Sequence, residues 1–162
     1  MPMRATFWAA FWAFLIDQLS KYLVVHAMDL SRVHVIKVWP PFLTFRYGEN
    51  QGINFGLFQD DSDLMRWILV GFSVAVCIAV IWWVRRCKGG IGMQIGAGLM
   101  VGGALGNVVD RLLYGYVLDF LNMSCCGIDN PYVFNIADVF IFGGAAALFL
   151  FEPRGQNRKK TP

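Results

Sequence analysis

Several ionisable side chains interrupt apolar stretches of this chain. Charged groups inside apolar segments are costly, so each of them needs a partner or a chemical purpose. Asp17 and Lys21 are four residues apart in the first such stretch, so one turn of a helix would let them form an ion pair. The pair has two interpretations. It either keeps both charges compatible with an apolar surrounding, or Lys21 also orients a site at the outer end of the helix.

A second set of polar residues lies in two later apolar stretches. Asn107 and Arg111 share one helix face, Asp119 follows Arg111 by eight residues, and Asn135 and Asp138 are three apart. We expect these groups to converge at one end of their helices. Two carboxylates held close together can share one proton, because like charges at short range cannot both ionise easily. Such a pair supplies a base that activates water and an acid that polarises a carbonyl group.

The same acidic residues are also compatible with proton-coupled transport, since acids inside membranes often relay protons. The residues alone therefore leave an acid–base enzyme and a transporter open. No serine has a histidine at a suggestive position, so no serine offers a better mechanism. The four cysteines form no Cys-x-x-Cys pair or Cys/His cluster, so we expect no zinc site. Cys77 is predicted to be a small core residue, and the adjacent Cys125 and Cys126 are assigned to a loop without a catalytic role.

The composition predicts an integral membrane protein that forms one domain over residues 1–162. Hydrophobic residues make up 57% of the chain, charged residues only 15%, and the mean hydropathy is +0.51, which leaves too little polar surface for a soluble protein. The chain has no basic stripe with interleaved aromatic residues, so we expect no nucleic-acid partner. Four apolar stretches are long enough to cross a bilayer: 6–27, 65–84, 91–113 and 132–151.

Basic residues predict the orientation of these spans. Arg85, Arg86 and Lys88 crowd the link between the second and third spans, Arg4 precedes the first, and four basic residues follow the fourth. Because such residues favour the cytoplasmic side, both termini are predicted to be cytoplasmic, with residues 28–64 and 114–131 outside. The first span could instead be a cleavable signal peptide, but Asp17 and Lys21 interrupt the apolar run that such a peptide needs.

The outer segment 28–64 is predicted to contain two short strands, 33–38 and 42–47, because both runs are β-branched and aromatic and a Trp-Pro-Pro turn separates them. Its aromatic rings are expected to settle at the membrane surface. In the third span, Gly98, Gly102 and Gly106 recur every four residues. Such rows allow close helix packing in membranes, so we assign these glycines to packing.

Four separated blocks together resemble the bacterial lipoprotein signal peptidases (signal peptidase II), nearly from end to end. These blocks are Asp17-Gln18-Leu19-Ser20-Lys21, Asn50-Gln51-Gly52-Ile53-Asn54-Phe55-Gly56, the run Gly102 to Arg111 continued by Gly115 to Phe120, and Phe134-Asn135-Ile136-Ala137-Asp138. Each block is weak on its own, whereas their order on four predicted spans is specific. Asn54 departs from the small residue usual at its place, which leaves the shape of the local pocket open.

The resemblance implies an all-α membrane protein of four helices with a small outer β segment. It implies that Asp119 and Asp138 are the catalytic residues of an aspartic endopeptidase that needs no metal or cofactor. It further implies a site lined by Asn50, Gly52, Asn107, Arg111 and Asn135, with Asp17, Lys21 and Asp110 in support. The substrate would be a diacylglyceryl-modified prolipoprotein, cut before the modified cysteine at the outer face of the bacterial inner membrane. We expect a monomer embedded in membrane lipid.

Overall fold

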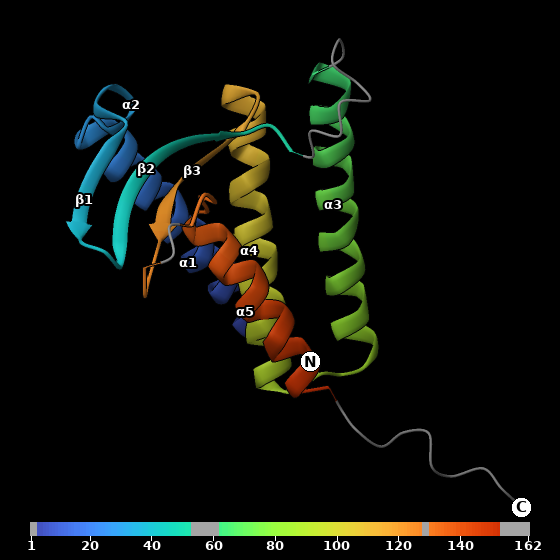
Figure 1. The fold of residues 1–162 in the computed structure, drawn as a ribbon. Helices are drawn as coiled ribbons and strands as arrows, with labels where there is room; N and C mark the ends of the chain where they lie inside the picture. Colours follow the sequence, from blue (N-terminus) through green and yellow to red (C-terminus); the bar gives the residue numbers. More distant parts are fainter. Residues whose placement is uncertain (1–2, 53–61, 128–129, 153–162) are drawn as a thin grey trace, which may run out of the picture.

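The structure is a computed structural model that describes residues 3–52, 62–127 and 130–152. Helices dominate it, and one small antiparallel sheet lies at one end (Figure 1). The elements in chain order are α1 (Arg4–Lys21), the π-helical turn η1 (Tyr22–Ala27), α2 (Leu30–Val33), β1 (Val35–Trp39), β2 (Leu43–Asn50), α3 (Ser62–Arg86), α4 (Ile91–Tyr114), β3 (Val117–Met123) and α5 (Ile136–Leu150).

Helix α4 is the central helix, with α1 and α5 packed closely against it and α3 standing to one side (Figure 1). Glycines permit these close approaches. A Cβ atom at Gly98 would lie 2.5 Å from the carbonyl oxygen of Thr6 in α1, and one at Gly103 would lie 2.5 Å from that of Ala137 in α5. A Cβ atom at Gly102 would likewise collide with the Ala10 carbonyl. The predicted packing role of Gly98 and Gly102 is therefore confirmed, and Gly103 adds a second surface.

Within the described residues, two helices are long and apolar enough to cross a membrane, namely α3 from Asp63 to Arg86 and α4. Helix α5 is apolar but has only 15 residues. It begins at Ile136 rather than at the predicted residue 132, because residues 132–135 are extended and lead into the helix cap at Asn135. The polar residues of α1 lie within its 18-residue helix, and the chain continues through η1 for one further turn.

The predicted strand pair is present, as β1 and β2 pair antiparallel on either side of residues 40–42. The first strand begins at Val35 rather than at residue 33, because Val33 belongs to α2, and it includes Trp39, which was assigned to the turn. The sheet contains a third strand, β3, which pairs antiparallel with β2. The prediction of a β segment confined to the chain between the first two spans was therefore incomplete. Its missing strand comes from the segment between α4 and α5, where apolar residues of β3 face a local core.

That local core ties the sheet to the end of α1. Leu118 and Phe120 of β3 pack against Val24 and Val25 of η1 and against Leu30 of α2. Phe120 also makes an edge-to-face contact with Phe45 of β2, with ring centroids 5.9 Å apart. Burial of these side chains fixes β3 over the helix ends. The sheet consequently lies at the opposite end of the molecule from the α3–α4 link (Figure 1).

Candidate active site

Asp119 lies in the middle of β3, where the strand brings it beside β2. Its backbone is paired in register with Gly48, and its side chain is only 4% exposed. Asn50, at the end of β2, donates a hydrogen bond of 3.0 Å from Nδ2 to Asp119 Oδ2. The third strand therefore positions this carboxylate, and the neighbouring strand supplies one of its hydrogen-bond donors.

Asp138 lies in the first turn of α5, within a capping box. Asn135 is the N-cap, and its Oδ1 accepts the backbone N–H of Asp138 at 3.0 Å. In return, Asp138 Oδ2 accepts the backbone N–H of Asn135 at 3.2 Å. An amide and a carboxylate three residues apart satisfy two otherwise free N–H groups in this way. The start of α5 thus fixes the Asp138 side chain.

Asn135 connects the two aspartates. Its side chain is fully buried, and Nδ2 donates to Asp119 Oδ1 at 2.6 Å, while the capping box holds Asp138. Asn107 of α4 completes the link, because its Nδ2 donates to Asp138 Oδ1 at 3.1 Å and its Oδ1 accepts from Asn135 at 3.2 Å. Two amides thus hold carboxylates from a strand and a helix in one hydrogen-bonded network.

The pKa of Asp119 is raised from an ordinary value of 3.8 to about 7, chiefly by burial and also by the charge of Asp138. The donors on Asn50 and Asn135 act in the opposite direction, because they stabilise the charged carboxylate. A carboxyl group with a pKa near 7 exchanges its proton at neutral pH. The nearby charge of Asp138 is thus one of the causes that favour the protonated form of Asp119.

Lys21 lies beneath this network in a buried cluster of charges. Its ammonium group is 2.8 Å from Asp17 Oδ2 and 2.7 Å from Asp110 Oδ2, and all three side chains are at most 3% exposed. It also donates to Asn107 Oδ1 at 3.2 Å. The predicted Asp17–Lys21 ion pair is therefore confirmed. Lys21 also contacts Asn107, whose amide donates to Asp138, so a role in orienting the site stays a prediction.

The two carboxylates of the cluster also anchor neighbouring backbone. Asp17 Oδ1 accepts the N–H of Ala137 in the first turn of α5 at 2.9 Å, and Asp110 Oδ2 accepts the N–H of Leu118 in β3 at 3.2 Å. Each anchored residue is adjacent in sequence to one of the aspartates of the site. The cluster therefore positions both elements that bear Asp119 and Asp138.

Gln18 and Gly106 were not predicted as parts of this cluster. Gln18 Nε2 lies 3.2 Å from Asp17 Oδ2 and 3.1 Å from Asp110 Oδ1. A Cβ atom at Gly106 would lie 2.5 Å from Asp17 Oδ2, so only glycine leaves room for this carboxylate. Gln18 follows Asp17 directly, and that adjacency was the one available signal. Gly106 was assigned to helix packing, whereas its neighbour is a charged side chain.

Two predicted site residues lie at the edge of the network. Arg111 is half-buried one turn after Asn107, donates to its carbonyl oxygen at 3.3 Å, and attracts both Asp119 and Asp138 electrostatically. Gly52 has a φ of +100°, which favours glycine, and its N–H donates to Asn50 Oδ1 at 3.0 Å. Gly52 thereby helps to orient Asn50. Asn54 lies outside the described residues.

The loop after β3 is held separately from the carboxylates. Asn122 Nδ2 donates to the carbonyl oxygens of Asn130 and Tyr132, at 2.7 and 2.8 Å. Cys125 and Cys126 are exposed and form a disulfide with each other, and Cys77 is buried as predicted. Among the described residues, no three His, Cys, Asp or Glu side chains are grouped to hold a metal ion. The arrangement provides two coupled carboxyl groups, amide donors and a nearby guanidinium.

Comparison with known proteins identifies the family to which the chain belongs. The profile described as Signal peptidase (SPase) II matches residues 9–152, which include every residue of the hydrogen-bonded network. The chain belongs to the signal peptidase II family. It is therefore a membrane-associated peptidase of the hydrolase class, in a family that processes lipoproteins.

Similar proteins cover almost the whole chain. A lipoprotein signal peptidase of Methylobacterium radiotolerans is 36% identical over 99% of this chain and 94% of its own length. One of Rhodopseudomonas palustris is 36% identical over 99% of both chains. A solved bacterial membrane enzyme is similar in fold with a TM-score of 0.77 and 26% identity, over 93% of this chain and 94% of that one. The resemblance inferred from four sequence blocks is thus confirmed.

Proposed function

We propose that this signal peptidase II family member is an aspartic endopeptidase whose catalytic pair is Asp119 and Asp138. The observation that supports this assignment best is their connection through Asn135, which donates to one carboxylate and caps the helix that begins beside the other. The raised pKa of Asp119 provides a proton that can move at neutral pH. Water, rather than a protein nucleophile, then attacks the peptide carbonyl.

In this mechanism, one carboxylate of the pair takes a proton from water as its oxygen bonds to the carbonyl carbon. The proton shared by the pair moves to the carbonyl oxygen, which gives a tetrahedral diol. When the C–N bond breaks, the first carboxyl group gives its proton to the leaving amine. One hydroxyl of the diol gives its proton to the second carboxylate as the C=O bond forms again. The products are a signal peptide with a new carboxylate and a lipoprotein with a free amino group on its cysteine, and the pair regains its single proton.

We propose that Arg111, Asn50, Gly52, Asn107 and Asn135 bind the substrate backbone or hold the pair in place. Arg111 and Asn50 are accessible for direct contact with the substrate, because Arg111 is half-buried and Asn50 is exposed at the end of β2. Asn107 and Asn135 are buried and contact the aspartates instead. Asp17, Lys21 and Asp110 would act through the backbone and amides that they anchor. The substrate would be a prolipoprotein that carries a diacylglyceryl-modified cysteine.

We further propose a single domain over residues 1–162 that crosses the bacterial inner membrane four times, by α1 with η1, α3, α4 and α5. Both termini would be cytoplasmic, and the site would lie near the outer face. The placement of the sheet at the opposite end from the basic α3–α4 link supports this orientation (Figure 1). The site would thus lie at the level where a lipid-modified cysteine enters from the outer leaflet.

The test is cleavage of a lipid-modified precursor by the purified protein in detergent. Mass analysis should find a product that begins at the modified cysteine, and an unmodified precursor should be cut far more slowly. Asp119→Asn and Asp138→Asn should each lower turnover by about 10³-fold or more, and the double variant should lose little beyond either single variant, because the two residues act as a unit.

Precursor binding and thermal unfolding of the same variants serve as controls. Both should persist, since the variants keep the size of each side chain. A folded Asn variant that cleaves near the parent rate would refute the pair. Failure of the parent to cut any lipid-modified precursor, with ion-coupled flux in its place, would support the transporter alternative.

A further inference from the structure

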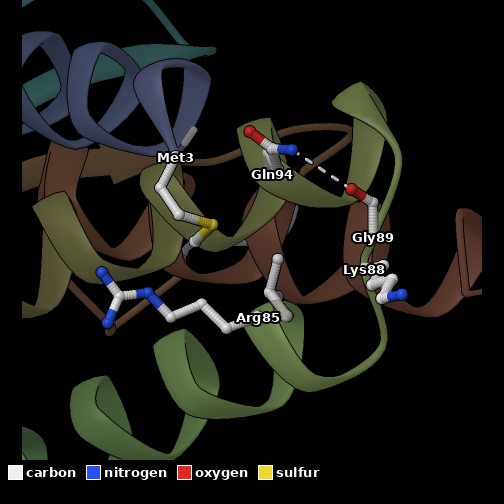
Figure 2. A pocket seen from close by; sticks show the side chains of 6 residues that line it. Met3, Arg85, Lys88, Gly89 and Gln94 are labelled. Carbon is white, nitrogen blue, oxygen red and sulfur yellow. Dashed lines mark hydrogen bonds between the residues drawn. The ribbon is translucent and has the colours of Figure 1, made fainter. Parts of the chain in front are cut away.

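A cavity of about 260 Å³ lies at the opposite end of the molecule from the carboxylate pair, where α3 ends and α4 begins (Figure 2). It is lined by Met3, Val84, Arg85, Lys88, Gly89 and Gln94. At ~30 Å³ per water, it could hold about nine waters, which is enough room for a phosphodiester group. We propose that this cavity binds the headgroup of an anionic membrane phospholipid. The inference depends on membrane embedding and not on peptidase activity.

Two cations give the cavity its charge. Arg85 lies in the last turn of α3 and extends below Met3, whereas Lys88 lies beside Gly89 with its amino group pointing away from Arg85 (Figure 2). Neither forms an ion pair within the described part of the chain. Two exposed cations without carboxylate partners therefore give the cavity a positive charge that attracts a phosphate group.

The backbone of the α3–α4 link fixes the position of Lys88. The N–H of Lys88 donates to the Arg85 carbonyl at 3.3 Å, and that of Gly89 donates to the Val84 carbonyl at 3.1 Å. These two bonds form a Schellman motif, in which the residue at the place of Lys88 is usually glycine. Lys88 has a φ of +47° there, although glycine would adopt this conformation more easily. The motif aligns a cation with the cavity.

Gln94 donates a hydrogen bond to a carbonyl oxygen that would otherwise repel an anion. Its side chain is 8% exposed, and Nε2 donates to the Gly89 carbonyl at 3.2 Å (Figure 2). That carbonyl is therefore already satisfied, and the lining presents mainly positive and apolar groups. The base of the cavity is apolar, because Val84 is 1% exposed and Met93 behind it is fully buried.

The apolar surroundings favour a lipid over a soluble phosphate. Ile91 at the start of α4 and Leu150 and Phe151 at the end of α5 are all more than half exposed. Trp82 is also exposed, and the Arg86 guanidinium lies 5.6 Å from the centre of its ring. Aromatic and basic side chains of this kind concentrate at the membrane interface, and basic pockets between membrane helices bind anionic headgroups.

Lipid binding by the full-length protein in detergent tests the inference. Phosphatidylglycerol and phosphatidylcholine with identical acyl chains are compared with glycerol phosphate, by native mass spectrometry and by the shift in Tm. Phosphatidylglycerol alone should bind and raise the Tm. Arg85→Gln and Lys88→Gly should each weaken its binding about fivefold, as expected when one cation near an anionic headgroup is lost. Lys88→Gly should leave lipid-free stability unchanged or higher, because glycine suits the positive φ.

Arg86→Gln is the matched control, since Arg86 belongs to the same basic link but does not line the cavity. It should bind phosphatidylglycerol almost as tightly as the parent. Equal weakening by Arg86→Gln would refute a built site and indicate diffuse surface charge. Equal stabilisation by phosphatidylcholine, or equal binding of glycerol phosphate, would refute recognition of an anionic lipid.

Discussion

At the scale of single residues, Asp119 combines deep burial with a proton that is released near neutral pH. The pKa of about 7 lies well above the value near 3.8 expected for the unfolded chain. The folded protein therefore binds more protons than the unfolded chain between these two values. Linkage then requires that the free energy of unfolding fall as pH rises through this window.

We expect the stabilising effect of this proton to be present below pH 4 and lost as pH approaches and passes 7. From pH 5 to pH 8, the loss should be about 2 to 3 kcal/mol for this residue. Asp119→Asn should remove this part of the pH dependence, although its stability at one pH will also reflect altered contacts with Asn50 and Asn135. Unfolding of both proteins at several pH values in detergent measures the difference in slope. Parallel slopes would show that Asp119 does not titrate in this range.

Asn135 has two separable tasks, which substitutions can divide. Serine is a good N-cap but cannot donate from an amide to Asp119, whereas alanine can do neither. We expect Asn135→Ser and Asn135→Ala to lose precursor cleavage to a similar extent. Asn135→Ala should be less stable than Asn135→Ser by about 1 kcal/mol, the typical value of a helix cap. Equal stability of the two variants would mean that the cap contributes nothing, and a fully active serine variant would mean that the amide donor is dispensable.

At the scale of elements, the α4–α5 contact determines where Asp138 lies. A Cβ atom at Gly103 would meet the Ala137 carbonyl, directly before Asp138, at 2.5 Å. Gly103→Ala should therefore push the start of α5 away, lower stability by about 1 to 3 kcal/mol and reduce cleavage strongly. Thermal unfolding and precursor cleavage measure both effects.

Gly143 provides the control for that substitution. It lies within α5, and a Cβ atom there would meet nothing within 4 Å. Gly143→Ala should therefore keep the parent activity and leave stability equal or slightly higher, because alanine favours a helix over glycine. If Gly103→Ala behaved like Gly143→Ala, close packing of α4 on α5 would not position the aspartate.

Elements differ in how well the sequence predicts them. Strands β1 and β2 are local runs of β-branched and aromatic residues with a Pro-Pro turn between them, so the types of the residues were sufficient to predict them. Strand β3 was missed, because its residues become a strand only by pairing with β2, about 70 positions earlier in the chain. The start of α5 was predicted too early for a related reason, since residues 132–135 are apolar enough for a span but are held extended before the Asn135 cap.

At the scale of the whole molecule, the basic link and the sheet predict opposite exposure for two sets of thiols. Cys87 lies beside the α3–α4 link, and Cys125 and Cys126 follow β3. After mild reduction of intact cells, a membrane-impermeant thiol reagent should label Cys125 and Cys126 but not Cys87. Labelling of Cys87 before permeabilisation would reverse the proposed orientation.

Cysteine-to-serine variants show which cysteine gives each labelling signal in that experiment. Cys87→Ser should leave labelling of intact cells unchanged and should remove the additional label that appears after permeabilisation. The double change of Cys125 and Cys126 to Ser should abolish labelling of intact cells.

The site as a whole was partly predictable from sequence. The blocks around Asp17, Asp110, Asp119 and Asp138 identify the residues that meet, and the four-residue spacing predicts the Asp17–Lys21 pair. The spacing could not reveal that Lys21 is shared with Asp110, or that Asp17 accepts a hydrogen bond from a residue 120 positions away. These contacts depend on how three helices and a strand meet, which one-dimensional patterns do not contain.

The hydrogen bond from Ala137 to Asp17 has a consequence for the order of synthesis. One of its partners is made 120 residues before the other, which belongs to a later segment of the chain. Asn135 and Asp138 also belong to this late segment, so an unfinished chain that ends before it contains only half of the carboxylate pair. The two carboxylates can therefore meet only after α5 has been synthesised. Chains that terminate before Asn135 therefore lack the carboxylate pair even if their earlier helices have folded.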